Sequence, residues 1–332
     1  MKKSIIYLVT ILILIISPMI LLTSFVFVYP DYYEKAYSRG IVLQYNYLKE
    51  TQDEDRIIFV GTSALTFGLD EQKVEDRFGK TVVSFGIYGA MGNSVIFEWS
   101  EDFIHEGDTV IFLYDIYEKA MHPFFGENIV LEGTYRNIEM FSKLSSKEKT
   151  QVLAALPNYL SKNIHRFRED QRLGDTFGAY TIDNFNEKGW FSAYRPRNKM
   201  QDGFVDEGTF THICPEIIDE EYTAIVNKWA TGLKNKGAKV LFTYGPVNEL
   251  IRQEESTDED GEAFMREWEK QIGIESITSI NENYFPSEYF YDENFHMNNE
   301  GEKFFTSYLI RKMEIALYGS TDYPLYEPKF EW

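Results

Sequence analysis

The chain has very little cysteine and few basic residues for its length. Cys214 is the single cysteine among 332 residues, so an internal disulfide and a cysteine-rich metal site are both excluded. Asp and Glu number 53 against 33 Lys and Arg, which gives a formal net charge of −20. Because an acidic body repels the phosphate backbone, nucleic acid is not an expected partner.

Histidine is also scarce, and the histidines do not form a metal-binding motif. Four of the five lie far apart, without the spacing of metal ligands: His105, His122, His165 and His212. A metal-dependent hydrolase is therefore the least supported class of function. Neither a metal nor a cofactor is expected.

One long run of the chain has no charge at all. Residues 5–28 are uncharged, and at about 1.5 Å of rise per residue such a helix crosses a hydrocarbon core of about 30 Å. A cleaved signal peptide is the alternative, but its apolar region is shorter and it needs small residues where residues 25–29 are bulky. We therefore predict a retained single-pass membrane anchor.

Charges on the two sides of this run predict its orientation. Lys2 and Lys3 precede it, and Asp31 and Glu34 follow it. Positive charge beside a span favours the cytoplasmic side, so the N-terminus is expected in the cytoplasm. The rest of the chain then lies outside the plasma membrane.

Beyond the anchor, apolar β-branched runs alternate with amphipathic segments. Apolar residues make up 44% of the chain, enough for a large core. Strands are predicted at residues 56–60, 81–84, 109–114, 239–243 and 276–280, and helices at residues 69–78, 93–104, 215–236, 262–272 and 299–317. This alternation predicts an α/β fold with a parallel sheet covered on both faces.

The alternation is interrupted in the middle of the chain. We expect an anchor over residues 1–30, a linker or helical stalk over 31–54 and one α/β domain over 55–332. Residues 116–214 contain one further predicted helix, at 146–167, and are otherwise polar and rich in aromatic residues. We predict that they form an insertion that caps the ligand end of the sheet.

Two turns after predicted strands contain candidate catalytic groups. In an open parallel sheet the ligand lies beyond the carboxyl ends of the strands. Ser63 follows the first strand and precedes a helix, where its hydroxyl is either a nucleophile or simply a helix N-cap. Gly86, Gly89 and Gly92 follow the second strand, and such a turn allows backbone N–H groups to face an anion.

A histidine with nearby carboxylates precedes the last predicted helix. Asp292 and Glu293 lie four and three residues before His296. A general base and a carboxylate that orients it require this combination of residues. The serine and the histidine are far apart in the sequence, yet both belong at the same edge of the sheet.

Taken together, these segments resemble the SGNH (GDSL-like) hydrolases, in particular their membrane-anchored extracytoplasmic branch. The resemblance covers roughly residues 55–115 and 237–317. It implies a three-layer flavodoxin-like fold, Ser63 as nucleophile, His296 as base and the N–H of Gly89 in the oxyanion hole. Asp292 is implied as the orienting acid, although Glu293 has the spacing that is commonest in the family.

The third segment departs from the family pattern. The family ends this strand with Gly-x-Asn, whose side chain completes the oxyanion hole, whereas this chain has Leu113, Tyr114 and Asp115. An ionised carboxylate repels an oxyanion, so Asp115 is a poor substitute. Asn248, after another strand, is an alternative donor, although it is equally suited to be a turn residue.

The resemblance implies an extracytoplasmic serine esterase or O-acyltransferase that forms an acyl-enzyme on Ser63. The membrane anchor favours acetyl esters of cell-envelope polysaccharides as substrates, followed by D-alanyl esters of teichoic acids. A membrane acyltransferase that supplies acyl groups is a candidate partner. The alternative is a non-catalytic glycan-binding or scaffold protein of a polysaccharide modification or export system, which the missing asparagine favours.

Overall fold

The computed structural model describes residues 2–28, 33, 35–115, 117–168, 178–200, 209–253 and 255–330. Asp31 and Glu34, used above to predict orientation, lie outside them. The strands are β1 (Arg56–Val60), β2 (Thr81–Phe85), β3 (Thr109–Tyr114), β4 (Lys239–Tyr244), β5 (Val247–Asn248) and β6 (Tyr284–Phe285). The α-helices are α1 (Lys2–Val28), α2 (Gly40–Glu50), α3 (Ser63–Gly68), α4 (Glu71–Phe78), α5 (Asn93–Ser100), α6 (Glu127–Thr134), α7 (Ile138–Lys143), α8 (Ser146–Arg168), α9 (Glu220–Asn235), α10 (Asp258–Ile272) and α11 (Asn299–Tyr318).

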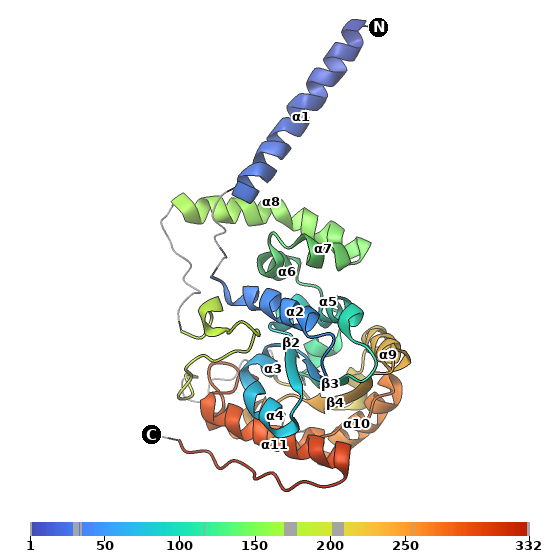
Figure 1. The fold of residues 1–332 in the computed structure, drawn as a ribbon, viewed down its shortest axis with the longest axis vertical. Coiled ribbons are helices and arrows are strands. Elements are labelled where there is room, and N and C mark those ends of the chain that lie inside the picture. Colours follow the sequence, from blue (N-terminus) through green and yellow to red (C-terminus); the bar gives the residue numbers. More distant parts are fainter. Residues whose placement is uncertain are drawn as a thin grey trace.

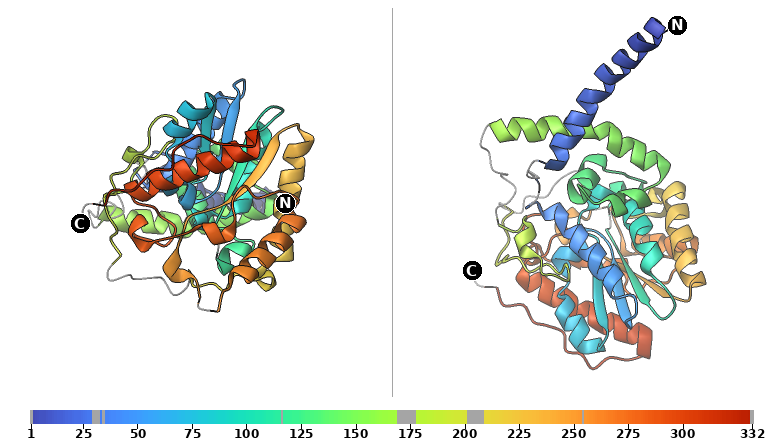
Figure 2. Two further views of the ribbon diagram at one scale, coloured as in Figure 1. Left: turned by 90° about the horizontal axis from the view of Figure 1, so that it is seen from below. Right: turned by 45° about the horizontal axis from the view of Figure 1, so that its top comes forward.

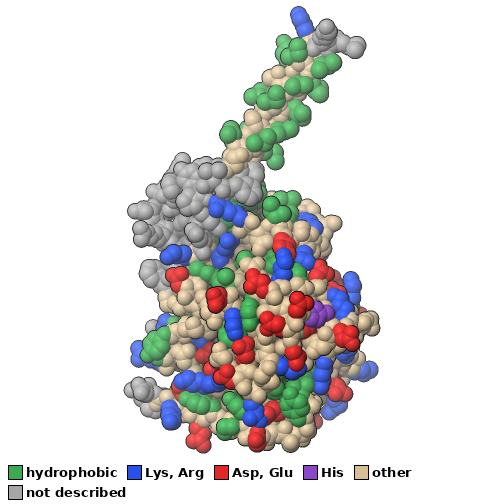
Figure 3. Space-filling view, in the orientation of Figure 1, with side chains coloured by type: hydrophobic (Ala, Val, Ile, Leu, Met, Phe, Trp, Pro, Cys, Tyr) green, Lys and Arg blue, Asp and Glu red, His purple; other side chains and the backbone are tan. Residues whose placement is uncertain are grey.

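Helix α1 projects away from the α/β body (Figure 1). Its segment Lys3–Leu21 is long and apolar enough to cross a membrane, and none of it is buried against the rest of the protein. Figure 3 shows apolar side chains along this helix, whereas acidic and basic side chains are mixed over the visible face of the body. By length and composition, α1 is a candidate membrane span.

Four parallel strands form the centre of the body, in the order β2-β1-β3-β4. Every residue of β1 and β3 is buried, as expected of strands covered on both faces. In the register of the sheet, Phe59 of β1 pairs with Ser84 of β2 and with Ile111 of β3. The predicted parallel sheet is confirmed, and its four strands have nearly the predicted bounds.

The fifth predicted strand, at residues 276–280, is wrong. Ser276 forms only an isolated parallel bridge with Phe242 of β4, and a 3-10 turn begins at Ile280. The hydroxyl of Ser276 donates to the carbonyl of Thr278 at 2.6 Å. Such local bonds between side chain and backbone compete with the ladder of a sheet, which explains why the apolar pattern does not produce a strand here.

Helices cover both faces of the sheet. Figures 1 and 2 show α4 and α11 on one face, and α2, α5 and α9 on the other. Helix α11 begins after Asn298, whose side chain accepts the N–H groups of Glu300 and Gly301. This cap places the start of α11 just beyond His296, at the carboxyl edge of the sheet.

The segment predicted as a linker or stalk contributes to the core. Helix α2 packs against β2, and its residues Ile41, Tyr45 and Leu48 are fully buried. The side chain of Gln44 accepts the N–H of Gly86 at 3.0 Å. The chain is therefore tied to the sheet soon after the end of α1.

The described part of the predicted insertion does not lie in one place. Residues at its two ends line a cavity at the carboxyl edge of the sheet: Tyr117, Lys119 and Thr209. Helices α6, α7 and α8 pack together beside α2, on the side of the body that is nearest to α1 (Figure 1). Residues 178–200 instead return to the sheet, where the indole of Trp190 donates to the carbonyl of Val82 at 3.2 Å. Ile116, at the start of the predicted insertion, lies outside the described residues.

Candidate active site

A cavity of about 290 Å³ lies at the carboxyl edge of the sheet. Ser63 lines it from the turn after β1, Gly89 from the turn after β2 and Asp115 from the end of β3. Glu293 and His296 line it from the loop before α11. The structure therefore brings together residues from four separate parts of the sequence.

Ser63 is the first residue of α3, but it is not the residue that caps the helix. Thr62 is the N-cap, and its hydroxyl accepts the N–H of Ala64 at 3.3 Å. Among the described residues, the hydroxyl of Ser63 makes no hydrogen bond. It lies in the cavity at the N-terminus of a helix, where the helix dipole favours negative charge.

His296 is buried, with 2% of its surface exposed. Its Nδ1 lies 3.2 Å from Asp292 Oδ1 and 3.1 Å from the hydroxyl of Tyr180. Its Nε2 lies 3.6 Å from Glu293 Oε2. Asp292, rather than Glu293, is thus placed to hold the proton on Nδ1 and leave Nε2 free to act as a base.

The imidazole of His296 is also held by an aromatic ring. It stacks on Phe67, with ring centroids 4.0 Å apart and an angle of 10° between the planes. Phe67 follows Ser63 by four residues on α3, so both residues lie on the same face of this helix. The helix that presents the serine therefore also positions the histidine.

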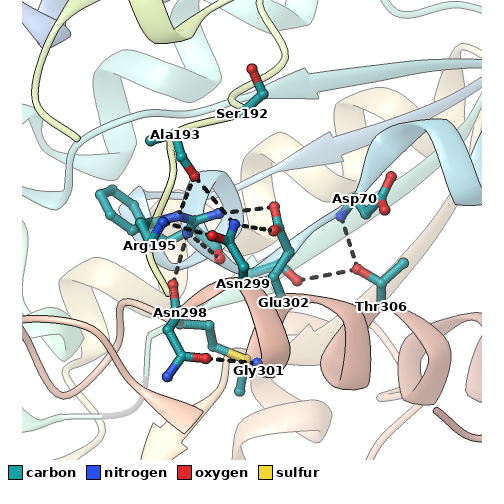
Figure 4. Close-up of polar contacts among 12 residues, drawn as sticks. Asp70, Ser192, Ala193, Arg195, Asn298, Asn299, Gly301, Glu302 and Thr306 are labelled. Atoms are coloured by element: carbon teal, nitrogen blue, oxygen red, sulfur yellow. Dashed lines mark hydrogen bonds and ion pairs between the residues drawn. The ribbon is translucent and has the colours of Figure 1, made fainter. Parts of the chain in front are cut away.

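A buried arginine from the insertion connects these elements (Figure 4). Arg195 is fully buried, and its Nη1 donates to the carbonyls of Phe67 and Met297, each at 2.8 Å. Its Nη2 lies 3.0 Å from Glu302 on α11. The guanidinium group thus joins the end of α3, the residue after His296 and the start of α11.

The three glycines of the second turn have different roles. A Cβ on Gly86 would lie 1.8 Å from the carbonyl oxygen of Gly61, and Gly86 has a φ of 145°, so this position requires glycine. Gly92 has a φ of 94° and is equally crowded. At Gly89 a Cβ would have room, with Asp115 Oδ2 at 3.7 Å and Thr62 Cβ at 3.8 Å as its nearest neighbours. Gly89 is thus part of the cavity wall beside Asp115.

Asp115 is nine-tenths buried, with 7% of its surface exposed. The hydroxyl of Thr62 donates to its Oδ2 at 2.5 Å. Within the described residues, its Oδ1 is buried and has no hydrogen-bond partner. Burial raises the pKa of this carboxyl to about 6, although Thr62 and His296 act in the opposite direction.

Asn248, predicted as an alternative oxyanion donor, does not line this cavity. It is fully buried, and its amide donates to Asn294 at 3.2 Å and to Ser287 at 3.4 Å. Its carbonyl oxygen accepts the N–H of Leu250, which caps a short 3-10 helix. These bonds give Asn248 a structural role in the loops beside the sheet.

Sequence reasoning missed Tyr180 and Arg195. Both come from the insertion, where no motif marks them, and both reach the site only through the fold. A scan against models of protein families gave no match, and a search of curated proteins found no related sequence. The interpretation of the site therefore depends on its geometry.

Proposed function

We propose that this protein is a serine esterase or O-acyltransferase that forms an acyl-enzyme on Ser63. The observation that supports it best is that Ser63 and His296 line the same cavity. Nδ1 of this histidine is within hydrogen-bond distance of Asp292 Oδ1, at 3.2 Å. A nucleophile, a base and a group that orients the base are the parts of a serine hydrolase. The remaining parts of the proposal follow from the resemblance to the SGNH hydrolases.

The proposed reaction has two steps. His296 Nε2 accepts the hydroxyl proton of Ser63 as the oxygen attacks the ester carbonyl, and the same proton then passes to the leaving alcohol as the carbon–oxygen bond breaks. In the second step, water or an acceptor hydroxyl gives its proton to Nε2 and attacks the acyl-enzyme. Nε2 then passes this proton to the Ser63 oxygen as the acyl–oxygen bond breaks, which regenerates the serine and the neutral histidine and releases either a free acid or a new ester.

Ser63 and His296 must move closer together for this reaction. No hydrogen bond joins their side chains in the described structure, and Glu293 lies near the Nε2 that must receive the proton. Catalytic hydrogen bonds are often long before substrate binds, and Glu293 is largely exposed and therefore free to move away.

The proposal includes a fold and a location. We assign the body to the three-layer flavodoxin-like SGNH fold, anchored by α1 with its N-terminus in the cytoplasm and the cavity outside the plasma membrane. Helices on both faces of a parallel sheet and the apolar, unburied α1 support this assignment. Acetyl esters of envelope polysaccharides are the proposed substrates, with D-alanyl esters second, and hydrolysis or transfer depends on whether water is excluded.

Covalent labelling of Ser63 tests the proposal. The full chain in detergent micelles is treated with a fluorophosphonate probe, and hydrolysis of an acetylated chromogenic ester is measured in parallel. We expect both activities to be lost in Ser63→Ala and His296→Ala. Ser146→Ala is the matched control. Ser146 also begins a helix, but its side chain is exposed and does not line the cavity. Unchanged rates in the first two variants would refute the mechanism.

The second candidate is a non-catalytic glycan-binding or scaffold protein. The separation of the Ser63 and His296 side chains favours it, as does the absence of the family's asparagine. Binding of acetylated envelope glycan by a protein that the probe does not label would support this candidate. Labelling that requires Ser63 would exclude it.

A further inference from the structure

The cavity contains a buried carboxyl group for which the proposed reaction has no use so far. Asp115 lies beside Ser63 and Gly89, at the position where the resembled family has an asparagine amide. An ionised carboxylate at this position opposes the negative charge that develops on the substrate oxygen. A neutral carboxyl group has the opposite effect, because its hydroxyl can donate a hydrogen bond.

The hydrogen bonds around Asp115 indicate whether its buried carboxyl group is better accommodated in the ionised or in the protonated form. Thr62 Oγ1 accepts the N–H of Ala64, so its own proton is free to bond Asp115 Oδ2 at 2.5 Å. Asp115 Oδ1 is buried and has no hydrogen-bond partner in the part of the chain that the structure describes. An unpaired, ionised oxygen in this position is costly, whereas a protonated group carries no charge to desolvate.

Counting protons shows what the pair offers a ligand. When Asp115 is ionised, the pair has one hydroxyl proton, which lies in the bond between Thr62 and Asp115. When Asp115 is protonated, the pair has two, and one of them has no acceptor within the pair. This second proton is available to an oxygen atom bound in the cavity.

We infer that the neutral Asp115–Thr62 pair donates a hydrogen bond to the developing oxyanion, in place of the family's asparagine. This inference rests on the proposed function, since an oxyanion forms only if Ser63 attacks a carbonyl. The proton remains on the pair throughout, and no bond to Asp115 forms or breaks. Each donor in an oxyanion hole contributes about 10²- to 10³-fold in rate.

The groups around Asp115 determine at which pH the pair is neutral. Burial is the main cause of the raised pKa of about 6, and Glu293 raises it further, whereas Thr62 and His296 lower it. The other titratable side chains that approach Asp115 or share a cavity with it come from the neighbouring strands, the insertion and α9: Tyr88, Tyr114, Tyr117, Lys119, His122 and Tyr222.

The pH dependence of probe labelling tests the inference. The rate of fluorophosphonate labelling of the full chain in detergent is measured from pH 5 to pH 9 for the wild type and for Asp115→Asn. The amide keeps a donor at every pH, whereas with a pKa of about 6 only about 1% of Asp115 is protonated at pH 8. The rate ratio of Asp115→Asn to wild type is therefore expected to rise about tenfold per pH unit above pH 6.

Two further variants complete the experiment. Asp115→Ala has no donor and is expected to label about 10²-fold more slowly than Asp115→Asn at all pH values. Asp53→Asn removes one exposed negative charge and is expected to match the wild type. Circular dichroism of each variant establishes that it is folded, and Asp115→Asn retains the size of the native side chain.

The outcomes separate this inference from the proposed function. A ratio of Asp115→Asn to wild type that does not change with pH would overturn the inference, as would equal rates for Asp115→Asn and Asp115→Ala. In both cases, labelling that requires Ser63 would leave the proposed function intact. Absence of labelling in every variant at every pH would overturn the proposed function and the inference together.

Discussion

Two buried aspartates flank β3, one at each edge of the sheet, and their surroundings differ. Asp108 precedes the strand and is 1% exposed, whereas Asp115 follows it and is 7% exposed. The carboxylate of Asp108 accepts bonds from Arg56 Nε at 2.9 Å and Arg56 Nη2 at 2.6 Å, and from the N–H of His105 at 2.9 Å. Among the residues that the structure describes, Asp115 has a single hydrogen-bond partner, the hydroxyl of Thr62.

The difference separates a carboxylate whose oxygens are bonded within the protein from one that keeps an oxygen without a partner among the described residues. The remaining donors of Arg56 bond the carbonyls of Leu48 and Phe103, so the amino edge satisfies its buried charges with the protein's own atoms. At the carboxyl edge, no described residue bonds Asp115 Oδ1, which lies beside a cavity. Changes at the amino edge should therefore alter stability, and changes at the carboxyl edge should alter activity.

The largest expected effect is at the carboxyl edge. Ser63→Ala and His296→Ala should each lower kcat for an acetyl ester by about 10⁴- to 10⁶-fold, because nucleophile and base act as one unit. The free energy of unfolding of Ser63→Ala, measured with urea, is expected to stay close to that of the wild type. A Ser63→Ala protein with full esterase activity would contradict the assignment of the carboxyl edge.

At the amino edge, Arg56→Met should lower the free energy of unfolding by about 3–5 kcal/mol, because it leaves the buried Asp108 without its cation. Urea unfolding measures this loss, and the kcat of the remaining folded protein should be unchanged. Arg266→Met is the matched control, since the Arg266–Glu262 pair at 3.6 Å is exposed on both sides and such pairs contribute about 0–1 kcal/mol. Equal losses in the two variants would remove the distinction.

The next largest effect is a dependence of stability on pH that arises from Asp115 at the carboxyl edge. Asp115 has a folded pKa of about 6 against about 4 when unfolded, so the folded state binds more protons between these values. The free energy of unfolding contributed by Asp115 is therefore greatest below pH 4 and decreases by about 3 kcal/mol as the pH rises through 6.

Asp115→Asn should lack this part of the decrease. Urea unfolding of the wild type and of Asp115→Asn at pH 4.5 and pH 7 measures the difference. Burial raises the pKa of Glu71 to about 8, but any contribution of Glu71 is the same in the two proteins. Parallel stability curves for the two proteins would show that Asp115 does not titrate in this way.

The smallest effect concerns the tyrosine beside the histidine. Tyr180→Phe removes the hydroxyl that lies 3.1 Å from His296 Nδ1, but leaves Asp292 in place. The loss of one hydrogen bond of about 0.5–1.5 kcal/mol should lower kcat about two- to tenfold. Steady-state kinetics measure this change, and Tyr194→Phe, at an exposed tyrosine of the same insertion, should have no effect. A larger loss than in His296→Ala would require a direct role for Tyr180.

The sequence allowed most of the sheet to be predicted, because buried parallel strands are continuous apolar runs. Residues 276–280 were an exception, since side-chain bonds of Ser276 compete with strand pairing. The sequence could not choose between Asp292 and Glu293, because their positions relative to His296 depend on how the loop closes. The loop closes through a backbone bond from the N–H of Tyr291 to the carbonyl of His296 at 2.7 Å.

The sequence alone determined the apolar α1, the parallel sheet and the presence of a serine and a histidine near one sheet edge. These features depend on local hydrophobic pattern and on the common direction of parallel strands. Other features depend on the folded chain as a whole. They are the contacts that Arg195 and Tyr180 make around His296, the place of Asn248 outside the cavity, and the burial of Asp115 against Thr62. Burial and hydrogen-bond partners are set by segments far apart in the chain, and no local pattern encodes them.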